Sequence, residues 1–237
     1  MAASAFLPMQ NGPAGDSDDL AAAPELEKAD VELGKELGKR RQHPAVKAAS
    51  KFGKLGDQGP LYALSAGLLT IGLLTRNRRL SGSALSMFGA IALADRAKCG
   101  LKAIVHRTRP NVMEEEGIYR RGAGGSEDKG EQSFPSGHTA GSVAVARALS
   151  RHYPAVGATA GVAALFIALS RVAKGSHWPL DIVAGAVIGF ASEAVATNVI
   201  EQGLKVAEEQ TTFGFLPIMK PSEASWRRRA WAAIQPR

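Results

Sequence analysis

Apolar stretches separated by short charged or glycine-containing breaks dominate the chain from residue 58 to residue 200. Their length, and the lack of a useful alternation of apolar and polar positions, predict helices rather than strands. The fold is therefore expected to be all-α. The five apolar segments are Gln58–Thr75, Leu80–Ala94, Thr139–Leu149, Tyr153–Ser170 and Ile182–Ile200.

Two environments would suit these segments. Their only charged residues are Arg147 and Glu193, and most approach the lower limit of about 17 residues for a membrane-spanning helix. They are rich in Ala and Gly, which lets membrane helices pack closely. The core helices of a soluble all-α protein would have a similar composition, so hydropathy alone leaves both environments open.

The chain before residue 59 is more polar. Apolar residues share one helical face in the stretch 25–41, with charges elsewhere. In the stretch 46–55, Lys47, Lys51 and Lys54 interleave with apolar residues, which suits either a helix on an anionic membrane surface or a solvated helix packed on the same domain. We expect residues 1–58 to be an N-terminal disordered and amphipathic region, 59–205 a helical-bundle domain, and 206–237 a C-terminal tail.

The composition narrows the classes of partner. A formal net charge of +7 suits nucleic acid, anionic lipid headgroups or phosphorylated substrates. No zinc-finger spacing or aromatic–basic pattern is present, so no nucleic-acid partner is expected. The single cysteine, Cys99, excludes an intramolecular disulfide. Residues 1–10 lack an early Lys or Arg and do not resemble a secretory signal.

The first cluster with candidate chemistry is Lys102, followed seven residues later by Arg109 and Pro110. Seven residues are nearly two helical turns, so both cations are expected on one helical face. Proline disfavours helix at the residue before it, so the helix is expected to end at Arg109. Two cations at a helix end suit an anion, but they also suit ordinary juxtamembrane charges.

The second cluster is the Pro-Ser-Gly-His run at residues 135–138, ahead of an apolar segment. A helix is expected to begin here, with Ser133 or Phe134 as its cap and Pro135 in its first turn. Free N–H groups at a helix N-terminus bind phosphate, and His138 beside them is a candidate proton donor. A histidine at a helix start is more often structural when it stands alone.

The third cluster contains Ser170, Arg171, His177 and Asp181. Pro179 is expected to start a helix with Asp181 in its first turn, close to His177. A carboxylate–imidazole hydrogen bond would fix the tautomer, leave the other ring nitrogen free and stabilise the imidazolium form. The alternative is a capping aspartate beside a loop histidine.

Together the three clusters resemble the signature of the type 2 phosphatidic acid phosphatase superfamily, which also contains vanadium haloperoxidases and soluble bacterial acid phosphatases. The signature is Lys-six-Arg-Pro, then Pro-Ser-Gly-His, then Ser-Arg-five-His-three-Asp, and every fixed position is kept in order. The resemblance covers about residues 59–200. Uncharged helices joined by motif-bearing loops match the membrane lipid phosphatase branch, so we expect a multi-pass transmembrane bundle of about five spans with its active site at the membrane interface.

The resemblance implies a role for each motif residue. His177 would attack phosphorus to give a phosphohistidine, Asp181 would orient His177, and His138 would protonate the leaving alcohol and then activate water. Three cations would hold the phosphoryl oxygens, so no metal or other cofactor is expected. These cations are Lys102, Arg109 and Arg171, and the backbone N–H groups of Ser136 and Gly137 with the Ser136 hydroxyl would complete the cradle.

The motifs contact only the phosphate and leave the lipid open. Phosphatidic acid, phosphatidylglycerophosphate, polyprenyl phosphate and polyprenyl diphosphate would all fit. A vanadium-dependent haloperoxidase and a non-catalytic lipid-binding membrane protein are alternatives, although binding alone does not need both histidines. His106 and Arg107, which lie between motif positions, are not expected to be essential.

The expected location is a bacterial inner membrane, from the high Ala, Gly and Arg content. Basic loops tend to lie on the cytoplasmic side. If the stretches 76–79 and 227–229 are cytoplasmic, an odd number of spans places the active site on the outer face. The basic stretch 35–54 argues for the opposite orientation, but we expect the active site to face outward.

Overall fold

The computed structural model describes residues 19–215, in two compact units that divide after Ala196. Residues 1–18, which are part of the region expected to be disordered and amphipathic, and residues 216–237, which are part of the expected tail, lie outside the described residues. The helices are α1 (Glu25–Gly38), α2 (Pro44–Phe52), α3 (Gln58–Leu74), α4 (Arg78–Ile104), α5 (Pro110–Glu116), α6 (Gly137–His152), α7 (Pro154–Ala173) and α8 (Pro179–Phe215), with short 3-10 turns η1 (Gly53–Gly56) and η2 (Lys129–Glu131).

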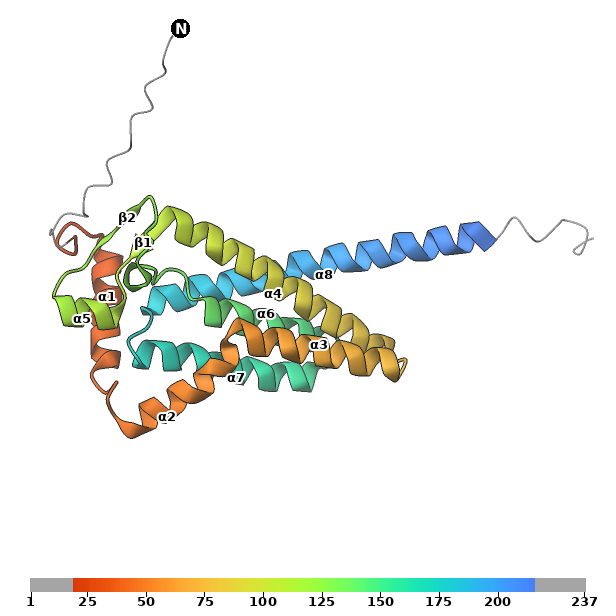
Figure 1. Ribbon diagram of the computed structural model, residues 1–237, viewed down its shortest axis with the longest axis horizontal. Helices are drawn as coiled ribbons and strands as arrows, with labels where there is room; N and C mark the ends of the chain where they lie inside the picture. The colour runs from red at the N-terminus through yellow and green to blue at the C-terminus, as the bar shows by residue number, and fades with distance from the viewer. Residues whose placement is uncertain (1–18, 216–237) are drawn as a thin grey trace, which may run out of the picture. The chain divides into compact units, whose positions relative to one another are not determined.

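Helix α6 lies at the centre of the bundle in the first unit (Figure 1). It packs against α4 and α7, and α3 packs against α4. Gly185 and Gly189 of α8 face α6 so closely that a Cβ on either would lie 2.5 Å from a backbone carbonyl of α6 or of its cap. Small residues thus let these helices approach, as expected from the composition. The main apolar core is made of Leu61, Met87, Ile91, Val145, Ala148 and Leu149.

The outer surfaces of α3, α7 and α8 are also apolar. Two helices among the described residues, Pro154–Ala173 and Pro179–Gly203, are long and apolar enough to cross a membrane, and the apolar Gln58–Leu74 is shorter. The expected number of about five spans stays a prediction. Exposed apolar side chains on this scale mark a surface that contacts lipid or another apolar partner. They include Leu64, Ile71, Val162, Leu165, Phe166, Leu169, Val183, Val187 and Phe190.

The two charges that interrupt the apolar segments belong to one ion-pair cluster. Glu193 of α8 is fully buried and accepts hydrogen bonds from Arg151 of α6, one of them at 3.3 Å. Arg147 Nη2 lies 3.5 Å from Glu193 Oε2. Charges inside an apolar bundle are expected to face its interior and to pair, which joins α6 to α8.

The expectation of an all-α fold needs one correction. Strand β1 (Val105–Arg107) pairs antiparallel with β2 (Arg121–Ala123). The polar stretch 111–132 contains most of α5, β2 and η2. Strands of three residues are too short for an alternating pattern to register, so their pairing depends on tertiary contacts. Figure 1 shows β1, β2, α1 and α5 together at one end of the bundle.

The N-terminal region packs against that same end. The leucine stripe of α1 faces outward, because Leu26, Leu33 and Leu37 are exposed. The opposite face of α1 is buried against Trp178, where Gly34 leaves no room for a Cβ atom. An apolar cluster of Val31, Met113, Tyr119 and Trp178 fills this contact.

Candidate functional site

Lys102 and Arg109 converge on one backbone carbonyl, but they do not share a helix. Helix α4 ends at Ile104, β1 follows, and Arg109 stands at the N-cap of α5, which begins at Pro110. The predicted helical geometry is therefore wrong. The two side chains still meet, because Lys102 Nζ and Arg109 Nη2 both donate to the carbonyl of Gln132, the second at 3.1 Å.

Backbone carbonyls hold both of these cations in place. Arg109 also donates to Lys129 O at 2.8 Å and to Ser176 O at 3.1 Å. Burial lowers the pKa of Lys102 to about 8, and the charge of Arg109 acts in the same direction. Among residues 19–215, carbonyls rather than carboxylates hold both cations, so their charges remain available to an anion.

Arg171 has buried donors that no protein group satisfies. It lies in the last turn of α7, and neither its Nε nor its Nη2 has a hydrogen-bond partner among residues 19–215. Buried polar groups are nearly always paired, so orphaned guanidinium donors point to a ligand. An anion with several oxygens would satisfy them.

The start of α6 differs from the expectation. Ser136, rather than Ser133 or Phe134, is the N-cap, and Pro135 lies before the helix. The Ser136 N–H donates to Asp181 O at 3.0 Å, and the Ser136 hydroxyl accepts from the Thr139 hydroxyl at 3.0 Å. Ser136 is fully buried. Its backbone N–H is therefore engaged inside the protein, which leaves Gly137 as the backbone donor of this motif at the cavity.

His177 is oriented by a carbonyl rather than by Asp181 directly. Its Nδ1 lies 2.7 Å from Ser133 O and 3.6 Å from Asp181 Oδ2, which is too long for a hydrogen bond. A carbonyl only accepts, so Nδ1 carries the proton and Nε2 keeps its lone pair. Burial lowers the pKa of His177, and Arg109 and Lys102 lower it further against the effect of Asp181. A neutral imidazole is the form that a nucleophile requires.

Asp181 organises the loop that carries His177. It lies in the first turn of α8, as expected, and is fully buried. Its Oδ2 accepts from Ser133 Oγ at 2.5 Å and from the Trp178 N–H at 2.8 Å. Ser133 thus connects the carboxylate to the histidine, because its hydroxyl bonds Asp181 and its carbonyl bonds His177.

Arg107, which was not expected to be essential, is buried and pairs with several charged and polar side chains. It donates to Asp181 Oδ1 at 2.9 Å, to Asp30 Oδ2 at 2.7 Å and to Tyr119 Oη at 2.7 Å. Asp30 in turn accepts from the Leu180 N–H at 2.8 Å. Helix α1 is therefore tied to the site, although it lies outside the motifs. A charged residue on an amphipathic helix gives no sequence signal of this kind.

His138 has a carboxylate partner that the motifs do not contain. Its Nε2 lies 2.5 Å from Oδ1 of Asp57, the residue between η1 and α3. Burial lowers the pKa of His138 to about 4, and the charge of Arg171 adds to this, while Asp57 opposes it. Whether His138 is protonated therefore depends on the balance of charges around it.

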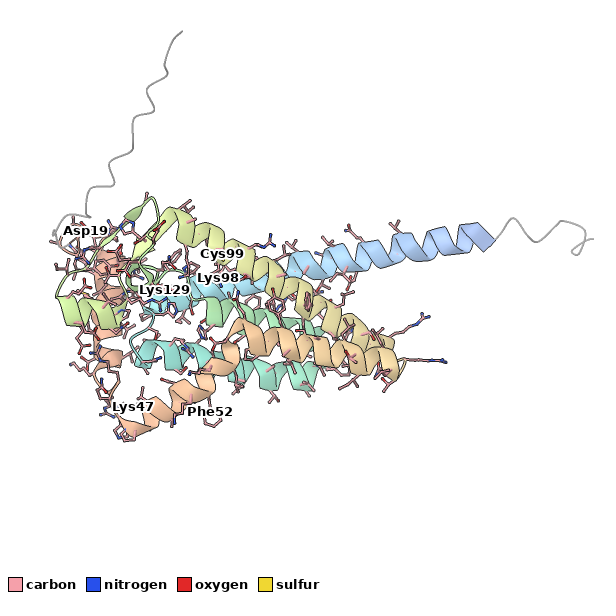
Figure 2. All side chains as sticks on the ribbon, in the orientation of Figure 1. Asp19, Lys47, Phe52, Lys98, Cys99 and Lys129 are labelled. Atoms are coloured by element: carbon pink, nitrogen blue, oxygen red, sulfur yellow. The ribbon has the colours of Figure 1, made fainter. Side chains whose placement is uncertain are left out.

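A cavity of about 430 Å³ brings most of the predicted residues together. Ser136, Arg171 and Asp181 are buried and do not line it. Lys98 does line it, from the same face of α4 as Lys102, and is labelled in Figure 2. The predicted residues in its wall are Lys102, Arg109, Gly137, His138 and His177, and sequence reasoning missed Asp57 and Lys98.

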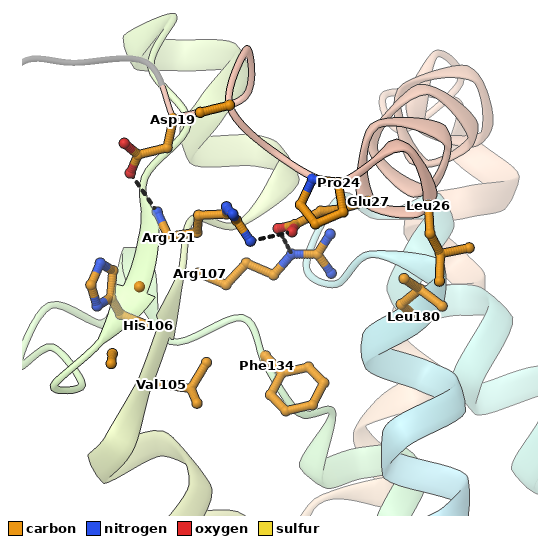
Figure 3. Close-up of a pocket in the computed structure, with 13 residues that line it drawn as sticks. Asp19, Pro24, Leu26, Glu27, Val105, His106, Arg107, Arg121, Phe134 and Leu180 are labelled. Atoms are coloured by element: carbon orange, nitrogen blue, oxygen red, sulfur yellow. Dashed lines mark hydrogen bonds and ion pairs between the residues drawn. The ribbon is translucent and has the colours of Figure 1, made fainter.

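A larger cavity of about 660 Å³ lies beside the site and contains none of the predicted residues (Figure 3). Arg107 and Phe134 contribute to its wall, and its charged groups pair with one another. Arg121 donates to Glu27 at 2.7 Å, and Arg107 Nε lies 3.6 Å from the same carboxylate. The chemistry therefore belongs to the smaller cavity.

Comparisons with known proteins identify the family of the chain and proteins with a similar fold. The model of the PAP2 superfamily matches residues 83–203, an interval that contains every predicted site residue. The crystal structure of Aquifex aeolicus LpxE is similar, with 22% identity and a TM-score of 0.51 over 71% of this chain and 94% of that chain. A transmembrane PAP2-type phosphatidylglycerolphosphate phosphatase from Bacillus subtilis is also similar, with 20% identity and a TM-score of 0.54 over 77% and 90%. No curated protein sequence matches the chain.

Proposed function

The chain belongs to the PAP2 superfamily, and from this premise we propose that it is a phosphatase that hydrolyses a membrane lipid phosphate through a phosphohistidine intermediate. The observation that carries the proposal is the pairing of two histidines in one cation-lined cavity. His177 presents a free Nε2, and His138 stands across from it with a carboxylate partner. A binding protein would need the cations but not this pair.

The phosphoryl group would be held by Lys102, Arg109 and Arg171. Arg171 supplies buried donors that have no protein partner among the described residues, and Lys102 and Arg109 are fixed by carbonyls. Preorganised cations stabilise the charge that builds up on the equatorial oxygens without rearranging. In this proposal Ser136 shapes the helix start, and Gly137 offers the backbone N–H.

Two chemical steps would follow. Nε2 of His177 forms a bond to phosphorus, the bond to the lipid oxygen breaks, and protonated His138 gives its proton to that oxygen. Water then attacks phosphorus as neutral His138 takes up a proton, and the P–N bond breaks to release phosphate and His177. The two negative charges of a bound phosphoryl group raise the pKa of His138, so the acid form arises when substrate is present.

The lipid itself would be a phosphomonoester or a diphosphate, of the phosphatidic acid or polyprenyl phosphate type. A membrane protein with outward-facing apolar helices meets such substrates in the bilayer. We further propose about five spans, a bacterial inner membrane and an outward-facing site. Lys47 and Phe52 of α2, labelled in Figure 2, are both exposed, which suits a helix lying at an anionic interface.

Phosphate release by purified protein in detergent, measured over a panel of those lipids, tests the proposal. One lipid should be hydrolysed well above the others, with full activity in EDTA and inhibition by vanadate. Oxidation of bromide with vanadate and peroxide, without any phosphate release, would instead establish a haloperoxidase. Lipid binding with neither activity would establish a non-catalytic protein.

A further inference from the structure

Asp57 stands at a helix cap but does not use its carboxylate for capping. It is the N-cap residue of α3, and no side-chain hydrogen bond to that helix is formed. An N-cap aspartate ordinarily accepts from an N–H of the first turn. Here Oδ1 of Asp57 lies 2.5 Å from Nε2 of His138 instead. The carboxylate therefore pairs with the histidine that lines the cavity and makes no local capping contact.

Two glycines hold the turn that carries Asp57 against the site. Gly53 and Gly56 begin and end η1, three residues apart, so they share one face of this 3-10 turn. A Cβ on Gly53 would lie 2.5 Å from Arg171 Nη2, and one on Gly56 would lie 2.8 Å from Ile167 Cγ2. Only glycine lets the backbone approach α7 this closely, so the position of Asp57 is set by packing and not by the ion pair alone.

The charge of Asp57 is distinctive in its surroundings. Among the described residues that line the cavity of about 430 Å³, Asp57 is the only acidic one. His138 faces Arg171 from α7 and His177 from the loop before α8, and the same cavity is lined by Lys98 and Lys102 from α4 and by Arg109. The cations among these groups favour the neutral form of His138. Among the described residues around His138, Asp57 is the one that favours the protonated form that a leaving group needs.

We propose that Asp57 is a positioning residue that holds the ring of His138 and keeps it protonated for transfer to the leaving oxygen. This inference rests on the proposed phosphatase mechanism. It assigns an active-site role to a segment that precedes residues 83–203, the part of the chain that matches the family. This role of Asp57 also accounts for the packing of the N-terminal region on the catalytic end of the bundle.

Leaving-group dependence of the Asp57→Asn variant tests the role. An alkyl phosphate needs a proton on its leaving oxygen, whereas nitrophenyl phosphate does not. Loss of part of the general-acid effect should lower the single-turnover rate of phosphoprotein formation from the alkyl ester on the order of tenfold to a hundredfold, with less than about a threefold change for the nitrophenyl ester. The alkaline limb of kcat for the alkyl ester should move to lower pH, because the carboxylate that raises the pKa of His138 is gone.

Two further variants separate this role from a structural one. Asp128→Asn changes an aspartate that does cap its turn, through a 2.8 Å bond from the Gly130 N–H, and should leave both substrates unaffected because asparagine caps equally well. In the His138→Ala background, Asp57→Asn should cause no additional loss, because the two side chains act as one unit.

An equal loss with both esters, or an additional loss in the His138→Ala background, would overturn the assignment to Asp57. Increased activity of Asp57→Asn would also overturn it, since the carboxylate would then be an inhibitor of the site. If wild-type protein hydrolyses neither ester nor any lipid phosphate, the proposed function itself fails, and that result is distinct from all of these.

Discussion

Nδ1 of His177 is 2.7 Å from the backbone carbonyl of Ser133, whereas the nearest oxygen of Asp181 is 3.6 Å away. The tautomer of the proposed nucleophile is therefore set by the main chain. In a triad where the carboxylate alone fixes the imidazole, an Asp→Asn change costs about 10⁴ in rate because the wrong tautomer forms. Here the carbonyl retains the correct tautomer whatever stands at position 181.

Asp181→Asn is therefore expected to be impaired but active. The amide keeps the shape of the side chain and loses the negative charge that stabilises a cationic His177. We expect kcat to fall on the order of 10²-fold, well short of the loss for His177→Ala. Single-turnover measurements of phosphate release from the preferred lipid would show this. A loss as complete as that of His177→Ala would mean that Asp181 controls the tautomer after all.

Part of this site was predictable from sequence. Apolar runs predicted the helices of the bundle, and the spacing of the three motifs predicted which side chains would meet, because motifs at helix ends are brought to one end of a bundle. Lys102 and Arg109 meet, as predicted, but they do not share the helix that was predicted to bring them together. A helix was extended through residues that form β1, and this strand exists because β2 pairs with it.

The contacts of Asp30 and Asp57 were not predicted, and both for the same reason, which is their long separation in sequence from their partners. Asp30 lies 77 residues from Arg107 and 151 residues from Asp181 in the chain, and Asp57 lies 81 residues from His138. Asp30 also sits among many charges on an amphipathic helix, where a solvated role is the ordinary one. Contacts over such separations depend on how α1 and η1 pack. Local sequence spacing does not indicate this packing.

Removing the guanidinium of Arg107 should destabilise the protein. Arg107→Ala leaves the buried carboxylates of Asp30 and Asp181 without their shared cation, and breaking a buried ion pair costs about 3–5 kcal/mol. The midpoint of thermal unfolding in detergent should fall clearly, together with kcat. His106→Ala, the adjacent strand position, is the matched control and should leave both almost unchanged. Wild-type values for Arg107→Ala would show that the two carboxylates do not need it.

The affinity for phosphate should weaken as pH rises through about 8. Burial lowers the pKa of Lys102 to about 8, so the folded protein loses this positive charge on the alkaline side of that value. The Kd of a non-hydrolysable lipid phosphonate should increase between pH 7 and pH 9. Lys102→Arg keeps its charge over this range and should lack most of that increase. If both proteins weaken equally, another group causes the pH dependence.

Substitution of His177 and substitution of His138 should block different steps of the reaction. His177→Ala removes the nucleophile, so no phosphoprotein can form with any substrate. His138→Ala removes the proton donor, and most of the general-acid effect of about 10²–10⁴-fold should be lost only with a poorly leaving alkoxide. Nitrophenyl phosphate leaves readily, so the His138→Ala variant should still phosphorylate His177. Hydrolysis of this intermediate should then stall, because His138 also activates the water. Acid-labile, base-stable phosphate should accumulate on the His138 variant and be absent from the His177 variant, and the reverse pattern would show that the two roles are exchanged.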